Sequence, residues 1–328
     1  MYTYTASSSS SSSLSHTPSP LTPHLTTLAS TLTSHPAATE YSTLVQADSH
    51  LEPDVDFVPL TSEVSTHSRS SFFLPLAHSA VRLTSPEGED LFIHANHVTL
   101  GPDAYIAAQG PVRSSVSRFW RMVWETNVTV IAMMSGLTEG DGDAETQKVY
   151  PYWPKRGSFD TGSLTVFYGE KKAFPSYKIR KLVLTHNATG ETRCISQFQI
   201  GEWLDMSVPD LSMFDDVMAA VAAKQARSAA SSSSPHPLLV HCSLGIGRTG
   251  TFIAAHALRT QIMEVVAAAQ AASAQTLPDA FPDILGTVDL LRKQRAFAVQ
   301  TPEQYAFLYQ YASHLLLSLA HVDDPHND

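Results

Sequence analysis

The hydrophobic and polar positions of the chain alternate in two ways that predict a mixture of strands and helices. Every second residue tends to be apolar in residues 163–168, 177–185 and 194–200, which is typical of strands with one buried face. Apolar residues recur every three or four positions in residues 211–221 and 258–265, which is typical of helices with one buried stripe. The sequence therefore predicts an α/β (α+β) domain in which a mixed β-sheet is backed by helices.

The two ends of the chain and two internal segments lack this periodicity. Residues 1–55 begin with a stretch rich in Ser, Thr and Pro, which offers too few periodic apolar positions to offset the entropy of ordering, so we expect a disordered N-terminal tail. One folded domain is expected over residues 56–320, followed by a C-terminal tail over residues 321–328. Residues 222–237 and 267–282 are rich in Ala, Ser and Pro, and we interpret them as loop insertions or extended helix ends.

The composition narrows the classes of function. The chain has 328 residues, of which 43% are hydrophobic, and a formal net charge of −10. We therefore expect no nucleic-acid partner and no membrane partner, because nucleic acids and anionic membranes attract dominant basic surfaces. The chain has two cysteines, Cys194 and Cys242, no secretory leader and no apolar stretch of about 18 residues. These features favour a location in a reducing compartment, namely the cytoplasm or the nucleus.

The most informative segment is His-Cys-Ser-Leu-Gly-Ile-Gly-Arg-Thr-Gly at residues 241–250. It follows an apolar stretch and precedes a long helical pattern, so it predicts a loop between a strand and a helix. Gly245 and Gly247 allow the tight curvature by which successive backbone amides can point inward at an anion. The positive end of the helix dipole adds to that field. A field of this sign favours a bound phosphate and also the thiolate of Cys242.

Cys242 and Arg248 carry the chemistry that this loop predicts. A cysteine thiolate is a nucleophile that can attack phosphorus. The planar guanidinium of Arg248 matches two oxygens of a phosphoryl group, and a lysine could not copy that geometry. The sequence therefore indicates a phosphate-binding loop in which Cys242 is the nucleophile and Arg248 holds the developing charge.

The complete string at residues 241–250 resembles the signature of the classical protein tyrosine phosphatases, with Leu244 where alanine is usual. Further strings are similar to motifs of that family and occur in the family's order: Phe92-Ile93-His94-Ala95-Asn96, Tyr105-Ile106-Ala107-Ala108-Gln109-Gly110-Pro111, Phe119-Trp120-Arg121-Met122-Val123-Trp124-Glu125, Tyr152-Trp153-Pro154 and Gln294-Arg295. The resemblance, to the non-receptor type, implies a highly twisted mixed β-sheet flanked by helices, with the phosphate-binding loop between a strand and a helix. It also implies a monomeric enzyme, without cofactor or metal, that hydrolyses phosphotyrosine on proteins through a cysteinyl-phosphate.

Residues 203–209, Trp-Leu-Asp-Met-Ser-Val-Pro, resemble the mobile Trp-Pro-Asp loop of the family. Expelling a tyrosyl oxygen requires a proton as the bond breaks, so we interpret Asp205 as the general acid and then as the base that activates water. An exposed loop aspartate without a chemical role is the alternative interpretation, and Asp210 is the nearest competitor. Leu204 stands where the family has proline, which leaves the stiffness of this loop open.

Two glutamines and two hydroxyl residues complete the candidate site. Gln300 resembles the family's glutamine that positions water for hydrolysis of the cysteinyl-phosphate, and Gln304 resembles its neighbour four residues on. A helix-capping box at residues 301–304 is the alternative explanation of Gln304. The hydroxyl of Thr249 resembles the one that the family assigns to leaving-group activation, with ordinary capping of the helix as its alternative. The predicted phosphate-binding residues are Ser243, Leu244, Gly245, Ile246, Gly247, Arg248 and Gln304.

Departures from the family pattern leave two questions open. A glutamate should pair with the signature arginine, and either Glu139 or Glu145 could fill that role, because this acidic segment is longer than usual. Ser70 replaces the tyrosine whose ring walls the phosphotyrosine pocket, and Ala77 replaces an aspartate; a shift of this loop that lets Phe72 restore the wall is the alternative. Two alternatives to a phosphotyrosine-specific enzyme therefore stay open. One is a phosphatase of broader specificity, acting on phosphoserine, phosphothreonine or phosphoinositides, and the other is a weakly catalytic phosphopeptide-binding module.

Overall fold

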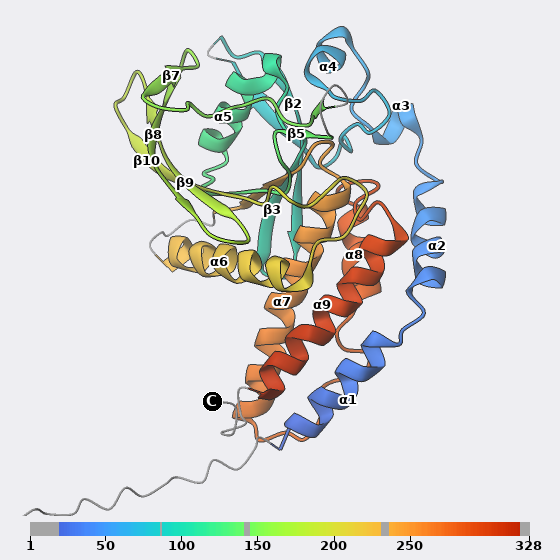
Figure 1. Cartoon of the computed structure of the whole chain (residues 1–328). Coiled ribbons are helices and arrows are strands. Elements are labelled where there is room, and N and C mark those ends of the chain that lie inside the picture. Colours follow the sequence, from blue (N-terminus) through green and yellow to red (C-terminus); the bar gives the residue numbers. More distant parts are fainter. Residues whose placement is uncertain (1–19, 86, 141–144, 231–235, 322–328) are drawn as a thin grey trace, which may run out of the picture.

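The computed structural model describes residues 20–85, 87–140, 145–230 and 236–321. They form a twisted nine-stranded β-sheet with helices on both faces, and a separate two-stranded hairpin (Figure 1). The order in the large sheet is β1-β2-β3-β11-β4-β10-β9-β8-β7. The strands are β1 Ala80–Thr84, β2 Asp90–Leu100, β3 Asp103–Ala108, β4 Val130–Met133, β5 Thr138–Glu139, β6 Thr146–Gln147, β7 Ser158–Asp160, β8 Leu164–Ala173, β9 Lys178–His186, β10 Thr192–Gln199 and β11 Leu238–His241.

The sheet is mixed, as the sequence predicts. β11 is parallel to both β3 and β4, and β10 is parallel to β4, whereas the other neighbouring pairs are antiparallel. β11 lies between β3 and β4, and all four of its residues are buried. A strand covered on both faces reads as a continuous apolar run rather than an alternation. The Leu-Leu-Val stretch before the signature is such a run.

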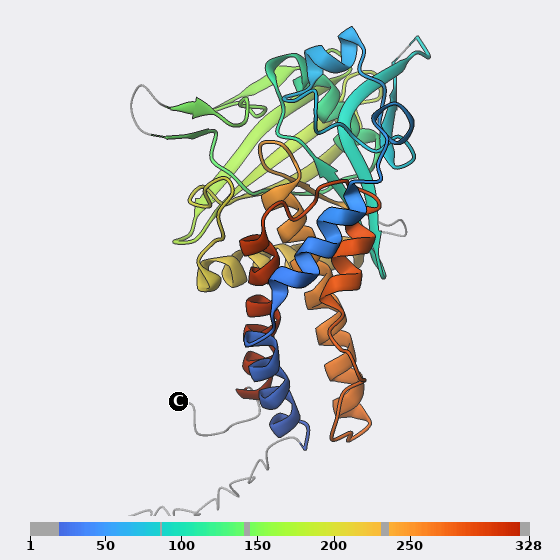
Figure 2. The same cartoon turned by 90° about the vertical axis from the view of Figure 1, so that its right-hand side faces the viewer.

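Helices cover the two faces of the sheet and create two hydrophobic cores (Figures 1 and 2). Val240 of β11 packs into the core shared with α6, α7, α8 and α9, whereas its neighbour Leu239 packs into the core shared with α5. The helices are α1 Thr22–Thr33, α2 Ala37–Asp48, α3 Pro53–Asp56, α4 Ser62–His67, α5 Val116–Glu125, α6 Leu211–Ala230, α7 Gly247–Ala271, α8 Ile284–Arg292 and α9 Pro302–His321, with a 3₁₀ turn at Arg113–Ser115. The predicted fold class is confirmed, and parts of the two Ala-rich segments are extended ends of α6 and α7.

The prediction of a disordered tail through residue 55 is wrong for the part that the structure describes. Helices α1 and α2 occupy most of residues 22–48, and α1 lies alongside α9 in both views (Figures 1 and 2). Leu21, Leu25 and Ala29 are fully buried in the core that also holds α7 and α9. This apolar stripe provides the burial that the Ser- and Thr-rich composition conceals. Residues 1–19, with their serine run, and residues 322–328 of the predicted C-terminal tail lie outside the described residues.

Among the described helices, none combines the length and apolar character that crossing a membrane requires.

Candidate active site

Cys242 lies between β11 and α7, in the segment of residues 241–248 that we call the cysteine loop. The residue is 2% exposed, and its Sγ accepts a hydrogen bond from the amide of Gly245 at 3.3 Å. Gly245 has a φ of 75°, and a Cβ at this position would collide with the carbonyl of Ala108 on β3. The bend that turns this amide toward sulfur therefore depends on glycine.

Side chains from distant parts of the chain hold the cysteine loop from behind. Arg295 donates to the carbonyls of Gly245 at 3.0 Å and Leu244 at 3.1 Å. His241 Nε2 lies 2.8 Å from the hydroxyl of Tyr152, and its Nδ1 lies 3.2 Å from the carbonyl of Cys242. Burial lowers the pKa of His241 to about 4, so the ring is neutral near pH 7. These contacts suit a residue that orients the loop rather than one that transfers protons.

The guanidinium of Arg248 is fully buried beneath two carboxylates. It donates to Glu139 and, at 2.6 Å, to the carbonyl of Trp203, and its Nη2 forms an ion pair with Asp205 Oδ1 at 3.1 Å. Burial acts to lower the pKa of Arg248, but the anions at Cys242, Glu139 and Asp205 outweigh it and raise that pKa. Nε and Nη2 have no hydrogen-bond partner among the described residues, since the Asp205 contact lacks hydrogen-bond geometry. Nε is thus without a partner in the described part of the chain, and Nη2 has only its ion pair with Asp205, so both could turn to an anion bound above the cysteine loop once Asp205 moves aside.

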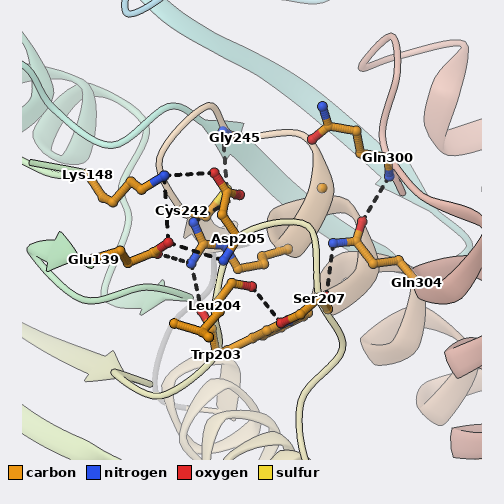
Figure 3. Close-up of polar contacts among 12 residues, drawn as sticks. Glu139, Lys148, Trp203, Leu204, Asp205, Ser207, Cys242, Gly245, Gln300 and Gln304 are labelled. Carbon is orange, nitrogen blue, oxygen red and sulfur yellow. Dashed lines mark hydrogen bonds and ion pairs between the residues drawn. The ribbon is translucent and has the colours of Figure 1, made fainter. Parts of the chain in front are cut away.

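Asp205 lies above Cys242 in a cluster with Lys148 and Glu139 (Figure 3). Lys148 Nζ is 3.0 Å from Asp205 Oδ2 and 3.6 Å from Glu139 Oε2. The backbone amide of Asp205 also donates to Glu139 Oε2 at 3.2 Å. The side chain of Asp205 is therefore held by two cations, and its backbone amide is held by a hydrogen bond to Glu139.

The loop that carries Asp205, residues 203–209, is fixed by its own hydrogen bonds although it lacks the expected proline. Trp203 is fully buried, and its indole donates to the carbonyl of Ser207 at 2.9 Å. The hydroxyl of Ser207 donates to the carbonyl of Leu204 at 2.8 Å, while the Leu204 side chain is exposed. These bonds constrain the loop, in place of the ring that a proline would provide.

Gln304 connects this loop to Gln300 (Figure 3). Its Oε1 accepts from the amide of Gln300 at 3.0 Å, and its Nε2 donates to the carbonyl of Ser207 at 3.2 Å. A Cβ on Gly247 would lie 3.1 Å from the side-chain oxygens of both glutamines, so both carboxamides reach the cysteine loop. The amide of Gln304 also donates to Thr301 Oγ1 at 3.1 Å, as a helix cap does. The two interpretations of Gln304 are thus compatible.

The sequence of the chain matches a known family along most of its length. A family model described as protein-tyrosine phosphatase matches residues 65–314. The chain belongs to this phosphatase family. Receptor-type tyrosine-protein phosphatase zeta of Rattus norvegicus is 31% identical over 308 residues, which cover 88% of this chain but 12% of that protein. Tyrosine-protein phosphatase non-receptor type 5 of Mus musculus is 32% identical over 255 residues, which cover 75% of this chain and 42% of that protein.

A solved structure shares the fold of this protein-tyrosine phosphatase chain. The structure of PTPN18 in complex with HER2-pY1196 phosphopeptides matches with a TM-score of 0.72 and 28% sequence identity. The match covers 85% of this chain and 93% of that one. The curated relatives are much longer proteins, since the chain spans 12% of the length of the rat relative.

Most of the predicted site residues lie together, and the structure separates several alternatives. Glu139 contacts Arg248, whereas Glu145 is exposed. Asp210 accepts a hydrogen bond from the amide of Met213 at the start of α6, so it caps that helix while Asp205 faces the cysteine loop. The buried hydroxyl of Thr249 has no hydrogen-bond partner in the described part of the chain.

Lys148 and Arg295 are site residues whose contacts no local sequence pattern indicates. Lys148 binds both carboxylates above the cysteine loop, and Arg295 binds two carbonyls below it. Both residues stand among the strings that resemble phosphatase motifs, Lys148 with Tyr152-Trp153-Pro154 and Arg295 with Gln294. That resemblance is the only sequence signal that could have identified these two residues, because their partners lie in other parts of the chain.

The segment around Ser70 lies next to the cysteine loop. The backbone amide of Arg69 donates to Gln109 Oε1 at 3.0 Å, and the amide of Gly110 donates to the carbonyl of Ser243 at 2.8 Å. The hydroxyl of Ser70 accepts from the amides of the next turn, from Phe72 at 3.1 Å and from Phe73 at 3.4 Å. The Phe72 residue is 85% exposed. Position 70 thus provides a hydroxyl that is used within its own turn, where the phosphatase pattern has an aromatic ring.

Proposed function

We propose that this chain hydrolyses phosphotyrosine on proteins through a cysteinyl-phosphate. The observation that carries the proposal is the buried Arg248 guanidinium, whose Nε and Nη2 make no hydrogen bond among the described residues and whose Nη2 is ion-paired with Asp205. In the first half-reaction the Cys242 thiolate forms a bond to phosphorus as the bond between phosphorus and the tyrosyl oxygen breaks. Asp205 gives its proton to the leaving oxygen, while Arg248 and the loop amides bind the equatorial oxygens.

In the second half-reaction water attacks the phosphorus of the cysteinyl-phosphate. The bond between sulfur and phosphorus breaks, its electron pair returns to Cys242, and the proton of water passes to Asp205. Gln300 positions this water, and the hydroxyl of Thr249, which has no partner among the described residues, stabilises the departing thiolate. Inorganic phosphate then leaves and Asp205 carries a proton for the next turnover. The neutral His241 takes part in neither proton transfer.

The test is the turnover of matched phosphotyrosyl and phosphoseryl peptides and a phosphoinositide by the wild type and by three variants. We expect phosphotyrosyl turnover to be abolished by Cys242→Ser. Asp205→Ala should lower kcat about 100-fold or more, the usual size of a general-acid contribution. Asp210→Ala is the matched control, since this aspartate caps α6, and it should retain near wild-type kcat. Binding of the phosphotyrosyl peptide without release of phosphate would instead identify a phosphopeptide-binding module.

A phosphatase of broader specificity is the second candidate, and the segment around Ser70 favours it. An aromatic wall beside a phenol ring contributes about 0.5 to 1.5 kcal/mol beyond area burial, and Ser70 provides no such wall. Turnover of the phosphoseryl peptide and the phosphoinositide decides between the two candidates. A kcat/KM on either substrate comparable to that on the phosphotyrosyl peptide would identify a phosphatase of broader specificity. We further propose that the chain acts as a monomer in a reducing compartment, the cytoplasm or also the nucleus, where Cys242 remains a free thiol.

A further inference from the structure

The backbone of Gln300 is held at both of its polar groups by side chains. Its amide donates to Gln304 Oε1 at 3.0 Å, and its carbonyl accepts a hydrogen bond from the hydroxyl of Tyr41. Tyr41 belongs to α2, which precedes residues 65–314, the part of the chain that matches the phosphatase family model. A contact from outside the matched segment thus reaches the residue that we assign to positioning water.

Tyr41 is fixed in place by Arg292, at the end of α8. The Arg292 guanidinium carbon lies 5.2 Å from the centroid of the Tyr41 ring, and Nη1 forms an ion pair with Asp48 of α2 at 3.0 Å. The same guanidinium donates to the carbonyls of Ala298 at 2.9 Å and Val299 at 2.8 Å. One cation therefore binds α2 on one side and the two residues before Gln300 on the other.

We propose that Tyr41 is a positioning residue for hydrolysis of the cysteinyl-phosphate. Its hydroxyl and the side chain of Gln304 together fix the orientation of the Gln300 peptide, and this orientation directs the carboxamide of Gln300 toward Gly247 and the cysteine loop. The inference rests on the proposed function, because it acts through the water that Gln300 holds. The covalent step is the one described above, in which water displaces sulfur from phosphorus.

The kinetic consequence is confined to the second half-reaction. Formation of the cysteinyl-phosphate uses Cys242, Arg248 and Asp205, and Tyr41 contacts none of these in the described hydrogen bonds and ion pairs. A slower hydrolysis step lowers kcat and KM by the same factor and leaves kcat/KM unchanged, since kcat/KM reports only the steps through cysteine phosphorylation. A variant at Tyr41 should show this pattern.

The experiment compares the wild type with Tyr41→Phe on 4-nitrophenyl phosphate, whose good leaving group makes hydrolysis rate-limiting. We expect kcat and KM both to fall by about threefold to tenfold, the loss that one hydrogen bond produces, with kcat/KM within about twofold of wild type. Rapid-mixing measurements should show a full burst of 4-nitrophenol followed by slower turnover. An unchanged kcat would overturn the inference, and so would a loss of kcat/KM equal to that of kcat.

Tyr309→Phe is the matched control. The hydroxyl of Tyr309 donates to Glu40 of α2, so its loss weakens the docking of the same helix without removing a bond to Gln300. This variant should keep the wild-type kcat and burst. An equal slowing of hydrolysis in Tyr309→Phe would assign the effect to helix docking and overturn the role of the Tyr41 hydroxyl. The proposed function has a separate test. If the wild type shows no turnover, the proposed function is wrong. If the wild type is active and Tyr41→Phe has the same kcat, only this inference is wrong.

Discussion

Replacing Lys148 with methionine tests whether this cation holds the proposed acid, Asp205, over Cys242. The Lys148 side chain is 20% exposed, and its ammonium bridges Asp205 at 3.0 Å and Glu139 at 3.6 Å. Because the Asp205 side chain is 34% exposed, solvent screens the pair and its contribution is about 1 kcal/mol. A loss of that size lowers the population of correctly placed acid about fivefold.

The assay measures kcat/KM for Lys148→Met on two substrates that differ in their need for the acid. Phenyl phosphate has a poor leaving group, and we expect its kcat/KM to fall about fivefold. The 4-nitrophenolate of 4-nitrophenyl phosphate leaves without protonation, so kcat/KM for this substrate should change less than about twofold. Lys148→Arg keeps the charge and should restore most of the difference. Equal losses on the two substrates would contradict this role, because they would place the effect of Lys148 on the nucleophile or on the bound phosphate.

Two further predictions concern stability. Burial lowers the pKa of His94 to about 3 and that of His241 to about 4, so below about pH 6.5 the unfolded chain binds two protons that the folded chain does not. The free energy of unfolding, measured in urea, should therefore fall by roughly 3 kcal/mol between about pH 6.5 and pH 5. In His94→Asn it should fall by about half as much. An equal fall in both proteins would contradict a buried, neutral His94 ring. Leu25→Ala should cost about 2 to 5 kcal/mol because Leu25 is fully buried, whereas the exposed Thr26→Ala should cost less than about 0.5 kcal/mol. Equal stability of these two variants would contradict the packing of α1.

The strand, loop and helix that carry Cys242 could be predicted from the sequence because their residue types leave few alternatives. A buried central strand requires an apolar run, and the bend at Gly245 requires a residue without a Cβ. Asp205 and Gln300 could be named only through the family resemblance, since contacts with distant parts of the chain define their places. Asp205 meets Arg248 of α7, and the peptide of Gln300 meets Tyr41 of α2.

The N-terminal helices show how composition can conceal periodicity. Leu25, Ala29 and Leu32 form a buried stripe at helical spacing within a segment that is otherwise rich in Ser, Thr and Pro. The surface that covers this stripe belongs to α9, and the hydroxyls of Thr33 and Ser313 are 2.9 Å apart although 280 residues separate them. No local window of sequence contains that partner.

The choice between Glu139 and Glu145 also depends on structure beyond the local pattern. Glu139 ends β5, which pairs with β6 in a hairpin of two residues on each side. Strands this short leave no alternation to read. The hairpin brings Glu139 and Lys148 to the same carboxylate cluster, and this placement decides the partner of Arg248.

The two hydrogen bonds of the Gln304 carboxamide couple two parts of the site. One carboxamide bonds both to the carbonyl of Ser207, in the loop of the proposed acid Asp205, and to the amide of Gln300, the residue proposed to position water. Changes at Ser207 and at Gln300 should therefore be energetically coupled rather than additive, as for any two groups that share a partner. Because Gln304 is fully buried, a substitution that removed its carboxamide should affect both proposed half-reactions without altering Cys242 itself.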